Sequence, residues 1–106
     1  MRQHLLNFLV SEKKYAPASI AIEKEISLND LKKRFDVVVY DLQLQPYLII
    51  ECKAPYISLD KSVVEQALRY NLTIKAQFLM ITNGISDLVF NSKNEVVELP
   101  LSPSQI

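Results

Sequence analysis

The sequence predicts an α/β domain with a mixed central sheet, from three observations. Short runs of β-branched and apolar residues at 37–39, 47–50 and 78–81 are typical of buried strands. Residues 1–13 and 58–72 instead repeat apolar side chains at helical spacing. The second helix separates two strands, and such a crossover favours their parallel pairing. The expected order is therefore helix, three strands, helix and strand, followed by a small β-hairpin.

The N-terminal segment, residues 1–13, is expected to be an amphipathic helix already under way at Met1. Its apolar side chains share one face and its polar ones occupy the remainder. Tyr15 and Pro17 then break the helix, because proline cannot continue it. Apolar and polar residues alternate over 20–26, which predicts a short strand.

Polar residues on and after this strand allow two interpretations each. Glu23 and Glu25 are expected on a solvated strand face, although Glu23 could instead add an acidic group to a metal site. Residues 27–34 are expected to form a polar turn that contains the cluster Lys32-Lys33-Arg34. Such a short basic run is usually solvated, but it could contact the phosphates of DNA.

The next two strands carry charge at defined places. Asp36 directly precedes the first apolar run, and Glu51 and Lys53 directly follow the second. The linker 41–46 is short enough for a hairpin, and Pro46 suits a turn or a strand start. In such a hairpin Asp36 lies near the end of the second strand, where Glu51 and Lys53 share one face.

This arrangement suits a divalent cation. Two neighbouring carboxylates repel, which raises one pKa unless a cation lies between them. Asp and Glu oxygens are ligands that Mg²⁺ or Mn²⁺ takes, and a nearby lysine can position water or stabilise charge on a phosphate. Alternatively, Asp36 caps a turn and Glu51 forms an exposed ion pair with Lys53. The apolar run before Glu51 favours a buried strand, however, where a carboxylate needs a partner.

The C-terminal half supplies the second helix and the remaining strands. Ser58 or Asp60 can cap the helix, and Asn83-Gly84 marks a turn with positive φ after the strand at 77–82. A terminal hairpin is expected around residues 92–94, between 88–90 and 95–99. The core-facing side of the helix is predicted to hold Val63, Val64, Ala67, Leu68 and Leu72.

Asp36 followed by Glu51-Cys52-Lys53 resembles the motif of the PD-(D/E)XK phosphodiesterase superfamily. The ordered blocks RFDVVVYD, IIECKAP, EQALRYN and FLMITNG resemble the N-terminal nuclease domain of type I restriction enzyme R (HsdR) subunits. The resemblance extends from the first helix to Gly84. It implies a restriction-endonuclease-like fold over residues 1–99, with 100–106 as a tail.

The resemblance also implies roles for individual residues. Asp36 and Glu51 would be metal ligands, together with the backbone carbonyl of Cys52, and Lys53 would be the catalytic lysine. Gln66 and Tyr70 match the QxxxY element, and their spacing places them on one helix face. From spacing alone they could equally be boundary residues of the helix; otherwise Gln66 could reach a phosphate or a water, and Tyr70 could orient Gln66 or contact DNA. The implied activity is cleavage of DNA with Mg²⁺, or Mn²⁺, as cofactor. The cysteine thiol is expected in the core.

Composition limits the function classes. The 106 residues make one domain, and the formal net charge of zero lacks the basic signature of many nucleic-acid binders. The chain is therefore expected to bind DNA weakly alone or with the help of other restriction-system subunits. A noncatalytic DNA-binding or assembly module of the same fold is the alternative. A single cysteine excludes an internal disulfide and suits the cytoplasm, and no apolar run is long enough to span a membrane.

Related domains usually carry an acidic residue just upstream of Arg2-Gln3, and here nothing precedes Met1. The chain is therefore expected to be a piece of a longer protein that lacks this acidic group. There is also no Gly-rich phosphate loop, so the helicase motor of a full restriction subunit is not encoded in these residues.

Overall fold

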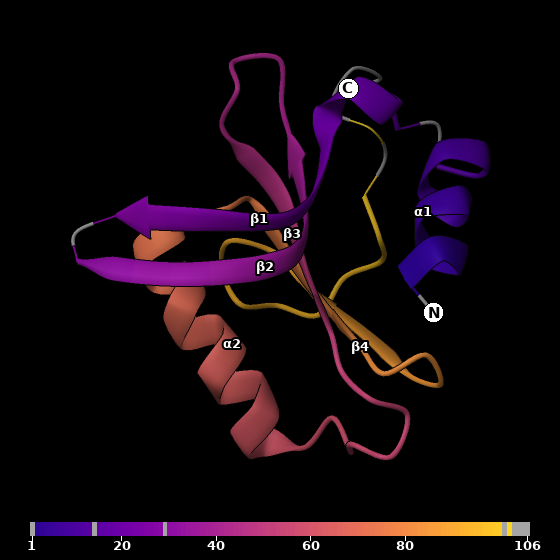
Figure 1. Ribbon diagram of the computed structural model, residues 1–106. Coiled ribbons are helices and arrows are strands. Elements are labelled where there is room, and N and C mark those ends of the chain that lie inside the picture. The colour runs from indigo at the N-terminus through magenta and orange to yellow at the C-terminus, as the bar shows by residue number, and fades with distance from the viewer. Residues whose placement is uncertain (1, 14, 29, 101, 103–106) are drawn as a thin grey trace.

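A computed structural model of the chain contains a five-stranded mixed sheet with one helix on each face (Figure 1). The structure describes residues 2–13, 15–28, 30–100 and 102. Its elements are α1 (Arg2–Ser11), a 3-10 turn (Pro17–Ser19), β1 (Ile20–Leu28), β2 (Leu31–Tyr40), β3 (Pro46–Cys52), α2 (Lys61–Ile74), β4 (Phe78–Thr82) and β5 (Asp87–Phe90).

The strands follow one another in the sheet in the order β1-β2-β3-β4-β5. β3 and β4 are parallel, with Ile50 paired to Met80, because α2 carries the chain back across the sheet between them. The other three neighbouring pairs are antiparallel, with Val38 opposite Ile49 in β2 and β3. The predicted α/β class, the hairpin at 41–46 and the parallel crossover are confirmed.

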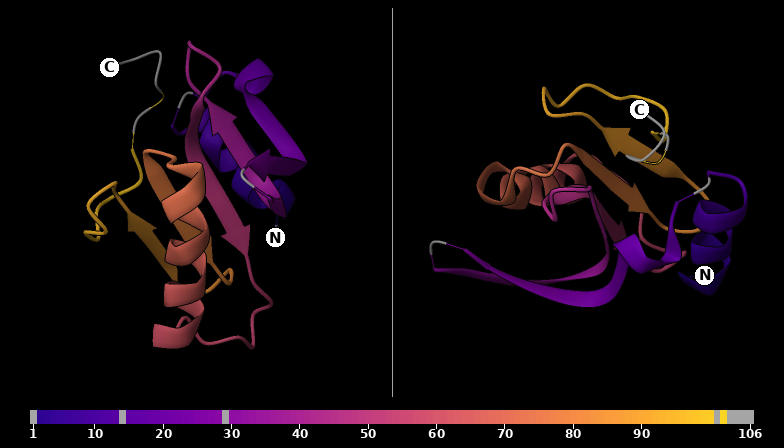
Figure 2. Two further views of the ribbon diagram at one scale, coloured as in Figure 1. Left: turned by 90° about the vertical axis from the view of Figure 1, so that its left-hand side faces the viewer. Right: turned by 90° about the horizontal axis from the view of Figure 1, so that it is seen from above.

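Helices α1 and α2 lie on opposite sides of the sheet (Figure 2), and an apolar core lies under each of them. Successive strand residues point to opposite faces, so Val37 and Val39 pack on the α1 side whereas Val38 packs on the α2 side. The central strands are buried on both faces, as continuous apolar runs predict. The largest fully buried side chains are Tyr15, Tyr47, Phe35, Leu9, Leu48, Ile49, Ile50, Leu79 and Ile81.

β1 and β2 form a hairpin arm that extends beyond the rest of the sheet (Figure 1). The predicted polar turn over 27–34 is wrong: both strands continue through it, and Leu28 pairs with Leu31 at the tip. Polar residues can line this arm because it is not covered on both faces. Glu23 has a φ of 53°, and the strand pairing skips this position. Asn29 lies outside the described residues, as do Met1 and Lys14.

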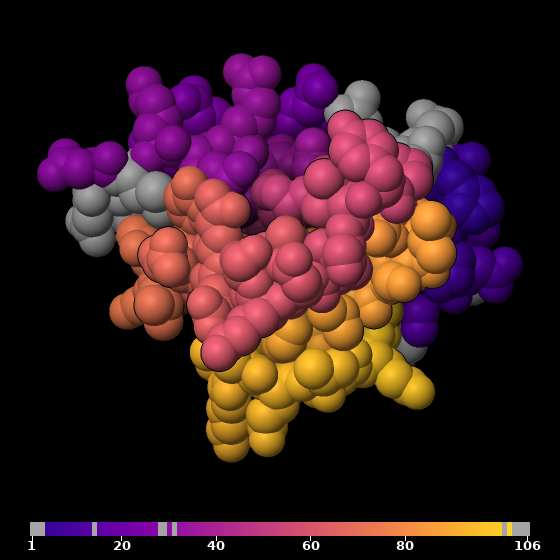
Figure 3. Space-filling view, turned by 90° about the horizontal axis from the view of Figure 1, so that it is seen from below, coloured from indigo at the N-terminus to yellow at the C-terminus, as the bar shows by residue number. Residues whose placement is uncertain are grey.

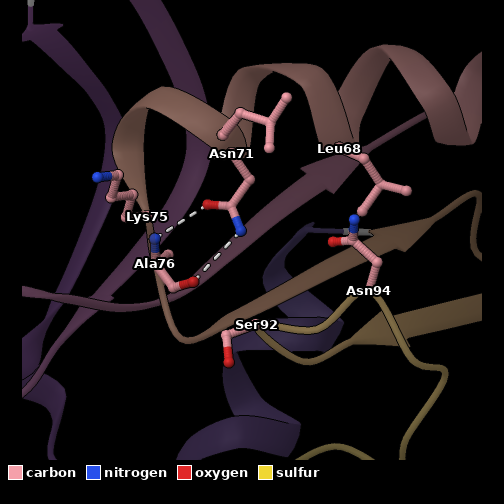
Figure 4. Close-up of a pocket in the computed structure, with 7 residues that line it drawn as sticks. Leu68, Asn71, Lys75, Ala76, Ser92 and Asn94 are labelled. Atoms are coloured by element: carbon pink, nitrogen blue, oxygen red, sulfur yellow. Dashed lines mark hydrogen bonds between the residues drawn. The ribbon is translucent and has the colours of Figure 1, made fainter.

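Side-chain hydrogen bonds define both ends of α2. The Asp60 carboxylate accepts from the amide of Val63 at 3.1 Å, which confirms Asp60 as the cap. At the other end Lys75 is left-handed, with φ 59°, and the Asn71 amide bonds both the N–H and the carbonyl of Ala76 (Figure 4). A surface hollow of about 320 Å³ opens beside this helix end. None of the predicted site residues lines it.

The prediction that Leu72 faces the core is wrong, since its side chain is 68% exposed. Ile74, two residues later, is buried instead. Two residues correspond to about 200° of rotation around an α-helix, so Leu72 and Ile74 lie on nearly opposite sides. The other predicted core positions of α2 do pack on the α2-side core, namely Val63, Val64, Ala67 and Leu68.

The chain after β5 returns along the sheet for only a short distance. Of the expected second limb, Val96 makes a single bridge to Phe90, and the Val97 amide donates to the Val89 carbonyl at 2.8 Å. The Tyr15 hydroxyl donates to the carbonyl of Pro100 at 2.7 Å, and this bond ties the segment after β5 to the region after α1. Leu101 and residues 103–106 of the predicted tail lie outside the described residues. Within the described part of the chain, no helix is long and apolar enough to cross a bilayer.

Candidate functional site

The candidate site lies where β2 and β3 separate. Their backbone ladder runs as far as Val37 and Ile50, and beyond it the Asp36 carboxylate accepts the Cys52 amide at 2.8 Å. The Asp36 side chain thus extends the hydrogen bonding between β2 and β3 past the end of their backbone ladder, through a carboxylate acceptor. Asp36 lies in the middle of β2 rather than at its start as predicted. The predicted meeting of Asp36 with the end of β3 is nevertheless observed.

Glu51 is the buried charged residue of this site, with 8% of its surface exposed. It follows Ile49 on the α2 side of β3, and one of its oxygens, Oε2, faces two ammonium groups. Lys33 Nζ lies 3.4 Å from this oxygen, and Lys53 Nζ lies 3.8 Å away. Burial of the carboxyl group raises the pKa of Glu51; the charge of Lys33 opposes this rise, and the charge of Asp36 adds to it.

Lys33 was not among the predicted site residues. Within the basic cluster, Lys32 and Arg34 are exposed, whereas Lys33 points back toward β3 and α2. Its Nζ lies 5.6 Å from the ring centre of Phe35 and 5.2 Å from that of Tyr70, within the range of cation–π attraction. The signal in the sequence was the spacing of Lys33 and Phe35, because residues two apart on a strand share a face.

Helix α2 completes the site from the opposite side. Gln66 is exposed and Tyr70 half-buried, and both border a small hollow of about 30 Å³. In Figure 3 the purple β1–β2 arm lies next to the salmon part of the surface, which belongs to α2. The hollow has room for a water molecule or a single ion. Its lining consists of Lys33, Glu51, Lys53, Val63, Gln66, Ala67 and Tyr70.

The donor atoms suit a hard divalent cation. Mg²⁺ usually takes one or two carboxylates from a protein and fills its other positions with water or phosphate. Asp36 and Glu51 supply two carboxylates, and the Cys52 carbonyl follows Glu51 directly. The Cys52 side chain itself packs against the α1-side core, as expected. Among the residues that the structure describes, no three or more His, Cys, Asp or Glu side chains are grouped so that they could hold a metal ion together.

Hydrogen bonds join the loop after β3 to the turn after β4, at the ends of these two parallel strands. The buried Asn83 donates to the Ile57 carbonyl at 2.7 Å and accepts from the amides of Ile85 and Ser86. Gly84 has a φ of 86°, which confirms the predicted positive φ in this turn. These bonds fix the loop that follows Lys53 against the turn after β4.

The chain matches a known protein family and is similar in fold to solved structures. Residues 1–103 match the family described as Type I restriction enzyme R protein N terminus (HSDR_N). A fragment of a candidate HsdR subunit of a type I restriction enzyme from Vibrio vulnificus YJ016 shares the fold with a TM-score of 0.64 and 17% identity. That comparison covers 95% of this chain, which spans only 22% of the Vibrio chain.

A second similar structure is a candidate nuclease of the DUF820 group from Anabaena variabilis ATCC 29413. Its TM-score is 0.56 and its identity 15%, over 99% of this chain and 73% of that one. Both solved structures share the restriction-endonuclease-like arrangement of strands and helices described above. No curated protein matches the chain.

Proposed function

This chain belongs to the family of type I restriction enzyme R protein N termini, and from this premise we propose that it is a Mg²⁺-dependent endonuclease domain that hydrolyses phosphodiester bonds of DNA. The observation that carries the proposal is the meeting of Asp36, Glu51 and Lys53 at the end of β3. These three side chains are also those that the PD-(D/E)XK resemblance implies. The proposed surroundings are the cytoplasm and a larger restriction protein.

Asp36 and Glu51 would hold the cation, together with the carbonyl oxygen of Cys52. Mg²⁺, or Mn²⁺ in its place, supplies positive charge at the scissile phosphate and lowers the pKa of water. Lys53 has its ammonium 3.8 Å from Glu51, so the same site presents a positive group to substrate. That ammonium would orient the attacking water and stabilise the charge that develops on the phosphate.

Gln66 and Tyr70 would act from α2. The Gln66 amide both donates and accepts hydrogen bonds, which suits contact with a phosphate oxygen or a water in the hollow that it borders. The Tyr70 ring contacts the Lys33 ammonium, so its first role is to hold that side chain beside Glu51.

A second candidate function is a noncatalytic DNA-binding or assembly module within a restriction complex. The charge balance of the site favours it, because two ammonium groups already face the buried carboxylate of Glu51. The chain also spans only 22% of its Vibrio relative, and in this alternative other segments or subunits would cut the DNA.

Cleavage of supercoiled plasmid by Lys53→Met tests the proposal. Loss of a group that stabilises developing charge lowers rates by about 100-fold or more, so we expect cleavage by the variant to fall at least that far. Lys93→Met is the matched control, since Lys93 is exposed in the turn after β5 and its loss changes the net charge equally.

Wild-type and Lys53→Met proteins that cut at the same rate would contradict the proposed mechanism. A folded wild type that binds DNA in a salt-sensitive manner without cutting it would instead support the noncatalytic module. Circular dichroism on each sample establishes that the variant is folded.

A further inference from the structure

We propose that Lys33 is a built-in counter-ion of the metal site, which gives up its place at Glu51 when a divalent cation binds. The inference rests on the proposed metal site and adds a residue outside the motif that suggested it. It assigns a function to the one member of the basic cluster that faces inward.

Lys33 and the proposed cation would occupy the same place beside Glu51. Lys33 Nζ lies 3.4 Å from Oε2, nearer than Lys53 Nζ at 3.8 Å, and only 10% of the Glu51 side chain is exposed. A Mg²⁺ ligand oxygen lies about 2.0–2.1 Å from the ion. An ion at this carboxylate and an ammonium in its present place would face each other across the same small hollow, where their charges repel strongly.

The charges of the side chains at the site already cancel. Asp36 and Glu51 contribute two negative charges, and Lys33 and Lys53 contribute two positive ones, so the described site is already balanced. A dication adds to a balanced site less readily than to one with excess negative charge. If Lys33 leaves, the two carboxylates and Lys53 retain a net negative charge. Glu51 then keeps a partner both before and after the ion binds, which a buried carboxylate requires.

The position of Lys33 in the fold allows its side chain to move. Lys33 lies on the projecting part of β2, beyond the last pairing with β3, and 26% of its side chain is exposed. Its ammonium donates a hydrogen bond to Glu51 Oε2 at 3.4 Å, whereas Phe35 and Tyr70 contact it only by cation–π attraction, which has little directional demand. The long lysine side chain can therefore swing outward without a change in the strand. Lys53, at the end of β3, remains at the site.

Calorimetric titration with Mn²⁺ of the wild type and of Lys33→Met tests this inference. Removal of the competing ammonium should tighten Mn²⁺ binding by about tenfold, a change of roughly 1.4 kcal/mol. Lys32→Met is the control, because Lys32 is exposed, carries the same charge and contacts Glu25 instead of Glu51. We expect this variant to bind Mn²⁺ as the wild type does.

The side chain of Lys33 gives a second readout that does not depend on affinity. Its Nζ lies 5.6 Å and 5.2 Å from two aromatic ring centres, so we expect the NMR resonance of the adjoining ε-methylene protons to be shifted by these rings. We expect saturating Mg²⁺ to move this resonance to the position of an exposed lysine. Equal Mn²⁺ affinities of wild type, Lys32→Met and Lys33→Met would overturn this inference but not the proposed function. A Lys33 resonance that stays unchanged at saturating Mg²⁺ would do the same. Failure of every variant to bind either ion would overturn the proposed function as well.

Discussion

Asp36 has a structural contact as well as a proposed catalytic one, and two substitutions separate them. Its carboxylate accepts the Cys52 amide at 2.8 Å, and it also adds negative charge beside Glu51. Asp36→Ala removes both the acceptor and the charge. Asp36→Asn removes the charge but keeps an oxygen acceptor of nearly the same shape. Both variants should lose Mg²⁺ binding and cleavage, and the first should lose more stability than the second.

The magnitude follows from the hydrogen bond. A bond to a charged acceptor contributes about 1.5–3 kcal/mol, and a neutral one about 0.5–1.5 kcal/mol. Both variants relieve the repulsion of Glu51 by Asp36, so this effect cancels in the comparison. Asp36→Ala should therefore be less stable than Asp36→Asn by about 1 kcal/mol. For a domain near this size, that difference corresponds to a Tm lower by about 4–8 °C.

Urea unfolding and thermal unfolding, both followed by circular dichroism in the presence of EDTA, measure this difference without any metal contribution. The expected order of stability is wild type, Asp36→Asn, Asp36→Ala. Equal unfolding free energies for the two variants would refute the reasoning, because the Asp36–Cys52 bond would then add nothing to the pairing of β2 and β3. The Asn side chain serves as the internal control for the loss of charge.

Two further predictions concern Glu51 and Tyr15. Because the pKa of Glu51 is raised, the folded state binds the proton of this carboxyl group more tightly than the unfolded state does. The protonated carboxyl group therefore favours the folded state below the ordinary pKa of 4.5, and this contribution to the free energy of unfolding is lost as pH rises through the raised pKa. The stability of Glu51→Gln relative to wild type should thus increase from pH 4 to pH 7 in metal-free urea titrations, and a pH-independent difference would contradict this. Tyr15→Phe removes the hydroxyl that donates to the Pro100 carbonyl at 2.7 Å and should cost about 1 kcal/mol. Hydrogen exchange should also become faster in the segment after β5, and unchanged exchange would mean that the bond does not anchor it.

The sequence predicted the central part of the site because the relevant signals are local. Apolar runs identified β3 and β4, and a helix between them required a parallel crossover. The short linker at 41–46 required β2 to pair antiparallel with β3, which brings Asp36 to the end of β3. Turn chemistry and strand alternation were sufficient for these steps.

Lys33 was missed because a polar composition was interpreted as a turn. Strands on a projecting arm need not be apolar, since solvent covers part of both faces. The reversal at the tip takes place between Leu28 and Leu31, and Asp30 there has a φ of 69°, which aspartate tolerates better than most residues. Such a tight reversal leaves Lys33 inside the strand. Its inward direction depends on Phe35 and Tyr70, whose positions only the tertiary structure defines.

The orientation of Leu72 could not be predicted for a related reason. Helical periodicity predicts an apolar stripe along α2, but it does not say which residues at the margin of the stripe face the sheet. Packing against the sheet decides this. Ile74 occupies the sheet side near the end of α2, so Leu72 faces solvent. The roles of Gln66 and Tyr70 depend on substrate as well as on fold, and they stay predictions.

The central claim is that Asp36 and Glu51 hold a divalent cation for cleavage of DNA. Calorimetric titration of the wild type and Glu51→Gln with Mg²⁺, with plasmid cleavage assayed on the same samples, tests it most directly. We expect the wild type to bind one ion and to cut, and the variant to lose both properties while it remains folded. Cleavage that persists in Glu51→Gln, or a folded wild type that neither binds Mg²⁺ nor cuts, would contradict the claim.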